Sequence, residues 1–251
     1  MASAVVCTTP EAPSIAPYPA SRPISLMRQA RRAAEVAREE YVIILTNLVS
    51  NSDTLGVRNV LRQFRMEDGA GLRELLRTVV TGGNVETLKA LVSGTGVSPA
   101  SQGMVEALVL AAENGLLEMV SCLLTMGVSA RVECSRPIVR AAMNGHLSVC
   151  QLLEEWGADP CTISDIALRR AASNDHSEVV GWLLEHGADI SACEYEAIWM
   201  AAAKGHARMA RSLILGGGPV PSEVVADALR KIRATGQADS DMECFAYVLD
   251  T

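Results

Sequence analysis

A short motif recurs in this chain at a fixed interval. It begins with two small residues, and its copies start at Ala111, Ala141, Ala171 and Ala201, which are 30 residues apart. A constant interval of about 20–50 residues is typical of proteins built from stacked copies of one supersecondary unit. The chain is therefore predicted to be an array of repeats. Such arrays present extended surfaces that bind other molecules.

Each copy of the unit reads as two helices joined by a tight turn. In the first copy, residues 107–112 and 117–124 are both apolar at helical spacing, as at Val120, Leu123 and Leu124. Glycine in the left-handed conformation suits a tight turn and the end of a helix. The turn residues are Gly115, Gly145, Asp175 and Gly205, and the helix-ending glycines are Gly127, Gly157, Gly187 and Gly217. Asp tolerates a positive φ angle better than most residues, so the third copy still fits.

The small pair in each copy predicts close packing between helices, because a larger side chain there would overpack the contact. A helix pair with one apolar stripe on each helix cannot bury its core alone, whereas stacked neighbours can. The predicted fold is therefore all-α, a solenoid of stacked helix-turn-helix repeats with helical caps.

Residues 171–189 carry the most complete copy of the unit. They match the pattern Ala-Ala-x-x-Gly-His-x-x-x-Val-x-x-Leu-Leu-x-x-Gly-Ala-Asp, with Asp175 in the glycine slot. This pattern resembles the ankyrin repeat, and the resemblance implies an ankyrin-like solenoid with short β-turn fingers and a role in protein binding. The unit is 30 residues long instead of about 33. The usual Thr-Pro-Leu-His opening is absent, and Glu196-Ala197-Ile198-Trp199 stands there in the fourth copy. Units of this length are similar to the ankyrin arrays of some large DNA viruses.

The rest of the chain divides around the repeats. Residues 1–23 hold five of the ten prolines and are interpreted as a disordered leader rich in Pro, Ala and Ser. Residues 24–70 are interpreted as an N-terminal cap helix followed by a degenerate repeat. The repeats occupy 71–218, as units at about 72–103, 104–133, 134–163, 164–193 and 194–218. Residues 219–251 are interpreted as C-terminal capping helices, because Arg233 replaces a small residue where an outer face would meet water.

Bulk properties narrow the classes of partner. The net charge of −7 argues against nucleic acid as the main ligand, since phosphate binding requires a positive face. No apolar run reaches the roughly 18–20 residues that a membrane span requires. A protein partner is therefore expected, with no nucleic acid and no membrane.

Seven cysteines, an odd number without a CxxC pair, favour a reducing compartment such as the cytoplasm. Cys122 and Cys150 lie on the apolar stripe of the second helices and are expected to be buried thiols. An organelle location is the alternative, because residues 1–34 contain one acid and four arginines, as some transit peptides do.

Three histidines, His146, His176 and His206, also recur every 30 residues. A column of histidines raises the hypothesis of a metal site. Packed helices lie about 8–10 Å apart, however, whereas zinc requires ligand atoms at about 2.0–2.1 Å. The sequence therefore predicts capping and packing histidines, with no metal site. It also lacks a nucleophile elbow and a phosphate-binding loop, so no catalytic or cofactor-binding residue is predicted.

The candidate partner-binding residues lie on the concave surface that the resemblance implies, at the turn-side ends of the first helices and on the fingers. They are Glu113, Asn114, Arg131, Glu133, Met143, Asn144, Ser173, Asn174, Glu194, Tyr195, Trp199 and Lys204. Exposed aromatic residues beside a polar rim are typical anchors of protein interfaces. Trp199 fits that role, but packing against the neighbouring first helix is an equal alternative. Arg140, Arg169 and Arg170 either bind an acidic partner or pair with local acids such as Asp165 and Asp189.

The predicted function is non-enzymatic protein–protein recognition through the concave face, by a monomer or a subunit of a hetero-complex. Two alternatives remain at this point. In one, the chain is an adaptor that holds a target on the repeats and recruits a ligase or trafficking factor through residues 1–49. In the other, it is a structural subunit of a larger assembly.

Overall fold

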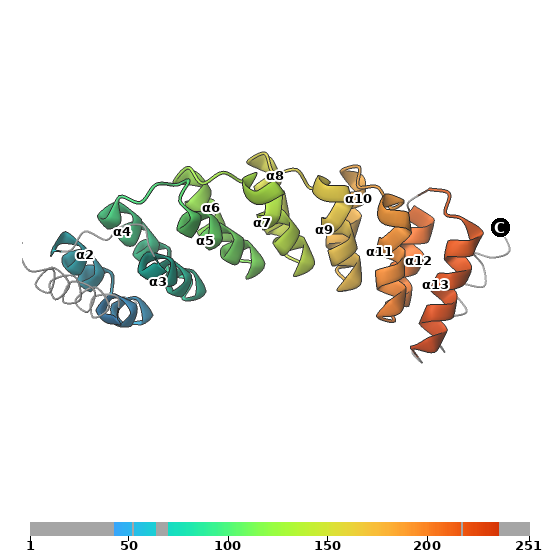
Figure 1. Ribbon diagram of the computed structural model, residues 1–251, viewed down its shortest axis with the longest axis horizontal. Coiled ribbons are helices and arrows are strands. Elements are labelled where there is room, and N and C mark those ends of the chain that lie inside the picture. The colour runs from blue at the N-terminus through green and yellow to red at the C-terminus, as the bar shows by residue number, and fades with distance from the viewer. Residues whose placement is uncertain (1–42, 52, 64–69, 217, 236–251) are drawn as a thin grey trace, which may run out of the picture. The chain divides into compact units, whose positions relative to one another are not determined.

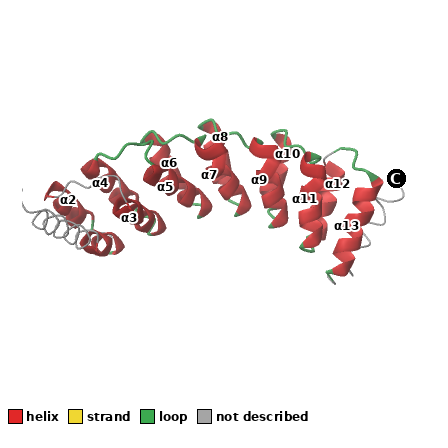
Figure 2. Cartoon of the chain, in the orientation of Figure 1, coloured by secondary structure: helices red, strands yellow, loops and turns green. Residues whose placement is uncertain are grey.

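The computed structural model describes residues 43–51, 53–63, 70–216 and 218–235. The predicted leader 1–23, the cap helix before residue 43 and the closing helix within 236–251 lie outside these residues. Within the described part, every regular element is a helix and none is a strand (Figure 2). Residues 43–50 form the first helix. It is followed by α2 (Thr54–Gln63), α3 (Ala70–Thr81), α4 (Val85–Thr95), α5 (Gln102–Glu113), α6 (Leu117–Thr125), α7 (Val132–Met143), α8 (Leu147–Glu155), α9 (Thr162–Ser173), α10 (Ser177–Glu185), α11 (Ala192–Ala203), α12 (Ala207–Gly216) and α13 (Ser222–Ala234).

The helices pack in two layers that follow the chain order (Figure 1). The first helices of the repeats form one layer, in which α3 contacts α5, α5 contacts α7, α7 contacts α9 and α9 contacts α11. α13 then packs against α11, in the segment predicted as a cap. The second helices form the other layer, in which α4, α6, α8 and α10 contact their neighbours in turn. Each first helix also packs on its own second helix, so every repeat buries apolar surface against its neighbours, as the period predicted.

The small pair of each repeat lies in the centre of this packing. Eight alanines, Ala111, Ala112, Ala141, Ala142, Ala171, Ala172, Ala201 and Ala202, are all 0 % exposed. The second helices add leucines that are buried to the same extent, such as Leu123, Leu153 and Leu183. Small side chains on the first helices let neighbouring backbones approach, and the leucines fill the space between the layers.

The turn residues adopt the left-handed conformation that the sequence predicted. The φ angles of Gly115, Gly145 and Gly205 lie between 70° and 82°, and Asp175 has a φ angle of 61°. The glycines that follow the second helices behave in the same way, with φ angles of 94°, 88° and 87° at Gly127, Gly157 and Gly187. Gly217 lies outside the described residues.

Two of the short connectors between repeats lead into the next first helix through a left-handed turn. In α7, the residues Glu133, Cys134 and Ser135 have φ angles of 48°, 57° and 59°, so the helix begins with a left-handed turn. Residues 193–195 repeat this turn at the start of α11. A left-handed residue other than glycine costs about 1–2 kcal/mol. One compensating contact is the hydroxyl of Ser135, which accepts a hydrogen bond from the backbone N–H of Asp159 in the next connector, at 3.1 Å.

Two thiols of the second helices are buried, as predicted. Cys122 is 8 % exposed and Cys150 is 0 % exposed. Burial raises the pKa of the Cys122 thiol, and it raises the pKa of Cys150 to about 12. The pKa of Cys161 is raised to about 11, first by burial and then by the neighbouring carboxylate of Asp165. None of the described helices is both long and apolar enough to cross a lipid bilayer.

These environments predict an order of thiol reactivity in the folded protein. At pH 8, a maleimide should label the exposed Cys134 and Cys193 within minutes, because the thiolate is the reactive form and their thiols are accessible. Cys161 should react more slowly than its partial exposure suggests, and Cys150 should react only after unfolding. Peptide mapping by mass spectrometry measures each rate. Equal native-state rates for Cys150 and Cys134 would contradict the burial described above.

Candidate protein-binding face

The outward surface of α3, α5, α7, α9 and α11, together with the turn after each helix, is called the first-helix face below. The sequence placed its main candidates where these helices end. Of these, Asn114, Asn144 and Lys204 are exposed, and Glu113, Met143 and Asn174 are half-buried. These residues remain accessible for contact with a partner.

The prediction for Ser173 is wrong. It was expected to face outward beside Asn174, but only 3 % of its surface is exposed. Its backbone carbonyl accepts a hydrogen bond from the ring of His206 in the following repeat, at 3.2 Å. Ser173 therefore belongs to the packing between repeats and offers no side-chain contact to a partner.

Part of the predicted set links one repeat to the next. The side-chain amide of Asn174 donates to the backbone carbonyl of Met143 in the preceding repeat, at 2.6 Å. The ammonium group of Lys204, in the following repeat, donates to Oδ1 of Asn174 at 2.9 Å. These two bonds join the ends of α7, α9 and α11, so the face holds a fixed arrangement of polar groups across three repeats.

The recurring histidines make the same kind of link. Nε2 of His146, His176 and His206 lies 3.1, 3.0 and 3.2 Å from the backbone carbonyls of Glu113, Met143 and Ser173, each in the preceding repeat. His146 and His176 occupy the N-cap positions of α8 and α10, but their side chains make no capping bond. The packing role is thus confirmed for all three side chains, while the capping role is wrong for His146 and His176.

Ion pairs cross between neighbouring first helices. A guanidinium nitrogen of Arg140 lies 3.8 Å from a carboxylate oxygen of Glu113, and Arg169 pairs with Glu196. Both arginines thus pair with local acids, although not with the aspartates that the sequence suggested. Arg170 is exposed and has no ion-pair partner within the described part of the chain.

A cavity of about 320 Å³ opens between α3, α5 and α7 on this face. Its lining combines four charged residues with two apolar ones, namely Arg77, Glu106, Glu113, Arg136, Val109 and Leu110. Sequence reasoning singled out only Glu113 from this set. The spacing of Arg136 and Arg140 could have indicated a basic surface here, because residues four apart lie on one side of a helix.

Trp199 is half-buried, and its contacts favour the packing alternative. Its indole N–H donates to the backbone carbonyl of Glu194 at 3.1 Å. The ammonium of Lys231, on α13, lies 4.0 Å from the ring centroid. Tyr195 is also partly buried and packs against the core, whereas Glu194 is exposed. Tyr195 therefore contributes to packing, and Trp199 is held by its contacts with Glu194 and Lys231 at the end of the array.

The two remaining candidates, Arg131 and Glu133, are exposed but already bonded. Nε of Arg131 donates to the backbone carbonyl of Gly157 in the next connector, at 2.5 Å. A guanidinium nitrogen of Arg136 donates to Glu133 at 2.5 Å, and the amide of Gln102 donates to it at 3.3 Å. These two bonds hold the pKa of Glu133 below its ordinary value, with Arg136 the larger cause. Both candidates thus fasten the connectors to their neighbours.

Equivalent pairs of helices that stack on one another in chain order define the class of helical-repeat proteins. Comparison with protein families identifies which kind: the family model described as ankyrin repeats (3 copies) matches residues 75–164, and the ankyrin repeat model matches residues 165–195. Residues 75–195 are therefore ankyrin repeats. No curated protein matches it. Ankyrin repeats are protein–protein interaction modules, and this chain carries the repeats that such modules use.

Proposed function

We propose that the chain is a non-enzymatic binding protein that holds a partner protein on its first-helix face, which we expect to be the concave side of the array. The observation that supports this most directly is the cavity between α3, α5 and α7. Charged side chains surround Val109 and Leu110 there, and an apolar centre with a polar rim is the usual composition of a protein interface. A partner residue that enters this cavity would contact both the apolar centre and the charged rim.

Exposed groups beside the cavity extend the proposed contact. The amides of Asn114 and Asn144 donate to carbonyls of their own helices, at 2.8 and 3.1 Å, which leaves each side-chain oxygen able to accept a bond from a partner. Arg170, further along on α9, supplies a cation with no partner in the described residues. The proposed site therefore comprises the cavity, the two asparagines and Arg170.

A pull-down with matched charge variants tests this function. The charge reversals Arg77→Glu and Arg136→Glu change the cavity, whereas Arg230→Glu and Arg233→Glu make the same net change on exposed positions of α13. Tagged wild type and both double variants are incubated with extracts of cells that express the chain. Bound proteins are quantified by mass spectrometry, after circular dichroism has shown equal helix content.

We expect at least one protein to be retained by the wild type and by the α13 variant. Its recovery on the cavity variant should fall about ten-fold, because opposite charges then face the same partner groups. The same proteins at equal levels on both variants would contradict binding at the first-helix face. The adaptor alternative rests on residues 1–49, most of which lie outside the described part, and no contact described above favours it or the structural-subunit alternative.

A further inference from the structure

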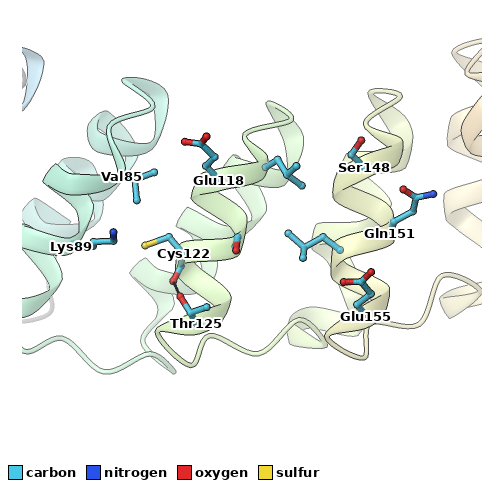
Figure 3. A pocket seen from close by; sticks show the side chains of 11 residues that line it. Val85, Lys89, Glu118, Cys122, Thr125, Ser148, Gln151 and Glu155 are labelled. Atoms are coloured by element: carbon cyan, nitrogen blue, oxygen red, sulfur yellow. Dashed lines mark hydrogen bonds between the residues drawn. The ribbon is translucent and has the colours of Figure 1, made fainter.

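A second hollow lies on the other layer of the array, away from the first-helix face. It is a groove of about 630 Å³ formed by the outer surfaces of α4, α6 and α8 (Figure 3). Lys89 of α4 lies on one side, and Gln151 and Glu155 of α8 lie on the other. The outer surface of α6 lies between them and forms the floor.

The groove exists because α6 carries small side chains where the next second helix, α8, carries large ones. Ser121 and Cys122 line the floor. Thirty residues later, the position of Cys122 is occupied by Leu152, and after another thirty by Trp182. Trp182 is buried against the ring of His186, with the ring centroids 4.6 Å apart, so the equivalent space is filled on α10.

The surface around the groove is acidic. The helices α6, α8 and α10 contain five glutamates, Glu118, Glu154, Glu155, Glu178 and Glu185, and neither lysine nor arginine. The one cation in the groove lining, Lys89, lies 2.8 Å from Glu86 and is neutralised by it. Glu118 and Glu155 also line the groove, and within the described residues neither has an ion-pair partner. Two uncompensated negative charges therefore face the groove.

The floor and one rim of the groove are apolar. Leu117 at the start of α6 is 43 % exposed, which is unusual for a leucine in the core-facing pattern of these helices. Leu152 is half-buried on the opposite wall. Burial raises the pKa of Cys122, so its thiol is neutral at pH 7 and adds to the apolar floor. An occupant would cover Leu117 and Leu152 and meet the two carboxylates.

We propose that this groove binds an extended peptide segment of a partner protein that carries an apolar side chain between two lysines or arginines. Glu118 lies in the first turn of α6, and Glu155 lies in the last turn of the neighbouring helix. A helix rise of 1.5 Å per residue and an interhelix distance of about 8–10 Å place the two carboxylates roughly 14 Å apart. An extended chain covers that distance in about four residues, so the two cations stand four residues apart. The site is separate from the first-helix face and does not depend on the function proposed for it.

The test uses a fluorescein-labelled peptide with the central sequence Arg-Ala-Leu-Ala-Arg, flanked by glycines and capped at both ends. Binding to the full chain is followed by fluorescence anisotropy. We expect saturable binding with a Kd of about 10–100 μM that weakens as salt is added. The double variant Glu118→Gln/Glu155→Gln should weaken it about ten-fold. Cys122→Leu should also weaken it, because leucine fills the floor as Leu152 does in the next repeat.

Two controls separate this site from non-specific attraction to an acidic protein. Glu178→Gln/Glu185→Gln removes the same amount of charge from α10 and should change the Kd less than two-fold. A peptide with glutamate in place of both arginines should not bind. The proposal is overturned if no saturable binding occurs, or if the α10 variant weakens binding as much as the groove variant. The cavity variant Arg77→Glu/Arg136→Glu should leave peptide binding unchanged, so the two sites can fail separately.

Discussion

Truncation of Leu153 to alanine is expected to lower the free energy of unfolding by about 2–5 kcal/mol. Leu153 lies in α8, in the middle of the described repeats, and it is 0 % exposed. The substitution removes apolar surface from the core and leaves a cavity between two layers that are fixed by neighbouring repeats on both sides. Since those neighbours restrict collapse around the site, we expect a loss in the upper half of this range. Guanidinium unfolding followed by far-UV circular dichroism measures it.

Leu215→Ala is the matched control, because the same side chain is 60 % exposed at the end of α12. Its loss should stay near 0.5 kcal/mol, as is usual for surface substitutions. The denaturant dependence adds a second readout. If the truncation at α8 uncouples the two halves of the array, the slope of the transition falls as well, because fewer repeats then unfold together. Equal losses for the two variants would contradict the central position of Leu153 in the core.

The repeat architecture could be predicted from the sequence because its determinants are local and periodic. The alanine pairs, the turn glycines and the helix-ending glycines each recur at a 30-residue interval, and each has one physical reason to stand at its position. The structure places all eight alanines in the core and gives the turn residues positive φ angles. Even Asp175 adopts the conformation of the glycines that it replaces.

The details of the candidate site depend on contacts between repeats, which a local pattern does not specify. Asn114, Asn144 and Asn174 occupy the same slot in three successive repeats. The first two donate to a carbonyl of their own helix, whereas Asn174 reaches across to the preceding repeat. The sequence could therefore predict a polar row on this face but not which members would remain free. Ser173 was assigned wrongly for the same reason.

The left-handed turns and the groove are two further features that the sequence alone could not predict. No residue type in Glu133-Cys134-Ser135 favours a positive φ angle, and that conformation follows from how the connector meets its neighbour. The groove arises from the difference in size between Cys122 and its counterparts Leu152 and Trp182. That difference is visible in the aligned repeats, but only the packing of α4 and α8 shows that the space stays open.

Alanine in place of Gly145 is expected to lower the free energy of unfolding by about 1.5–3.5 kcal/mol. Gly145 has a φ angle of 79°, and a Cβ atom there would lie 2.5 Å from Nδ1 of His176 in the next repeat. The left-handed conformation accounts for about 1–2 kcal/mol. The ring of His176 must also move, which breaks its bond to the backbone carbonyl of Met143 at a loss of about 0.5–1.5 kcal/mol, while the amide of Asn174 still donates to that carbonyl.

The third repeat shows what this turn requires when a side chain is present. Asp175 has a Cβ atom at the corresponding position, yet Nε2 of His206 still lies 3.2 Å from the carbonyl of Ser173. Nδ1 of His206 lies 4.0 Å from the Asp175 carboxylate, so an attractive contact replaces the close approach of ring and glycine. Alanine offers no such contact. The Gly145→Ala substitution should therefore destabilise the protein more than the presence of aspartate at position 175 would suggest.

Gly83 provides the control that separates strain from contact. It occupies the same turn between α3 and α4 with a φ angle of 68°, but nothing lies within 4 Å of its added Cβ, because the next repeat has Leu116 where the others have histidine. Gly83→Ala should therefore lose only the conformational part, about 1–2 kcal/mol. In the background of His176→Ala, the loss from Gly145→Ala should shrink to the Gly83 value. A loss that stays the same with and without His176 would mean that the histidine link contributes nothing to the coupling between these repeats.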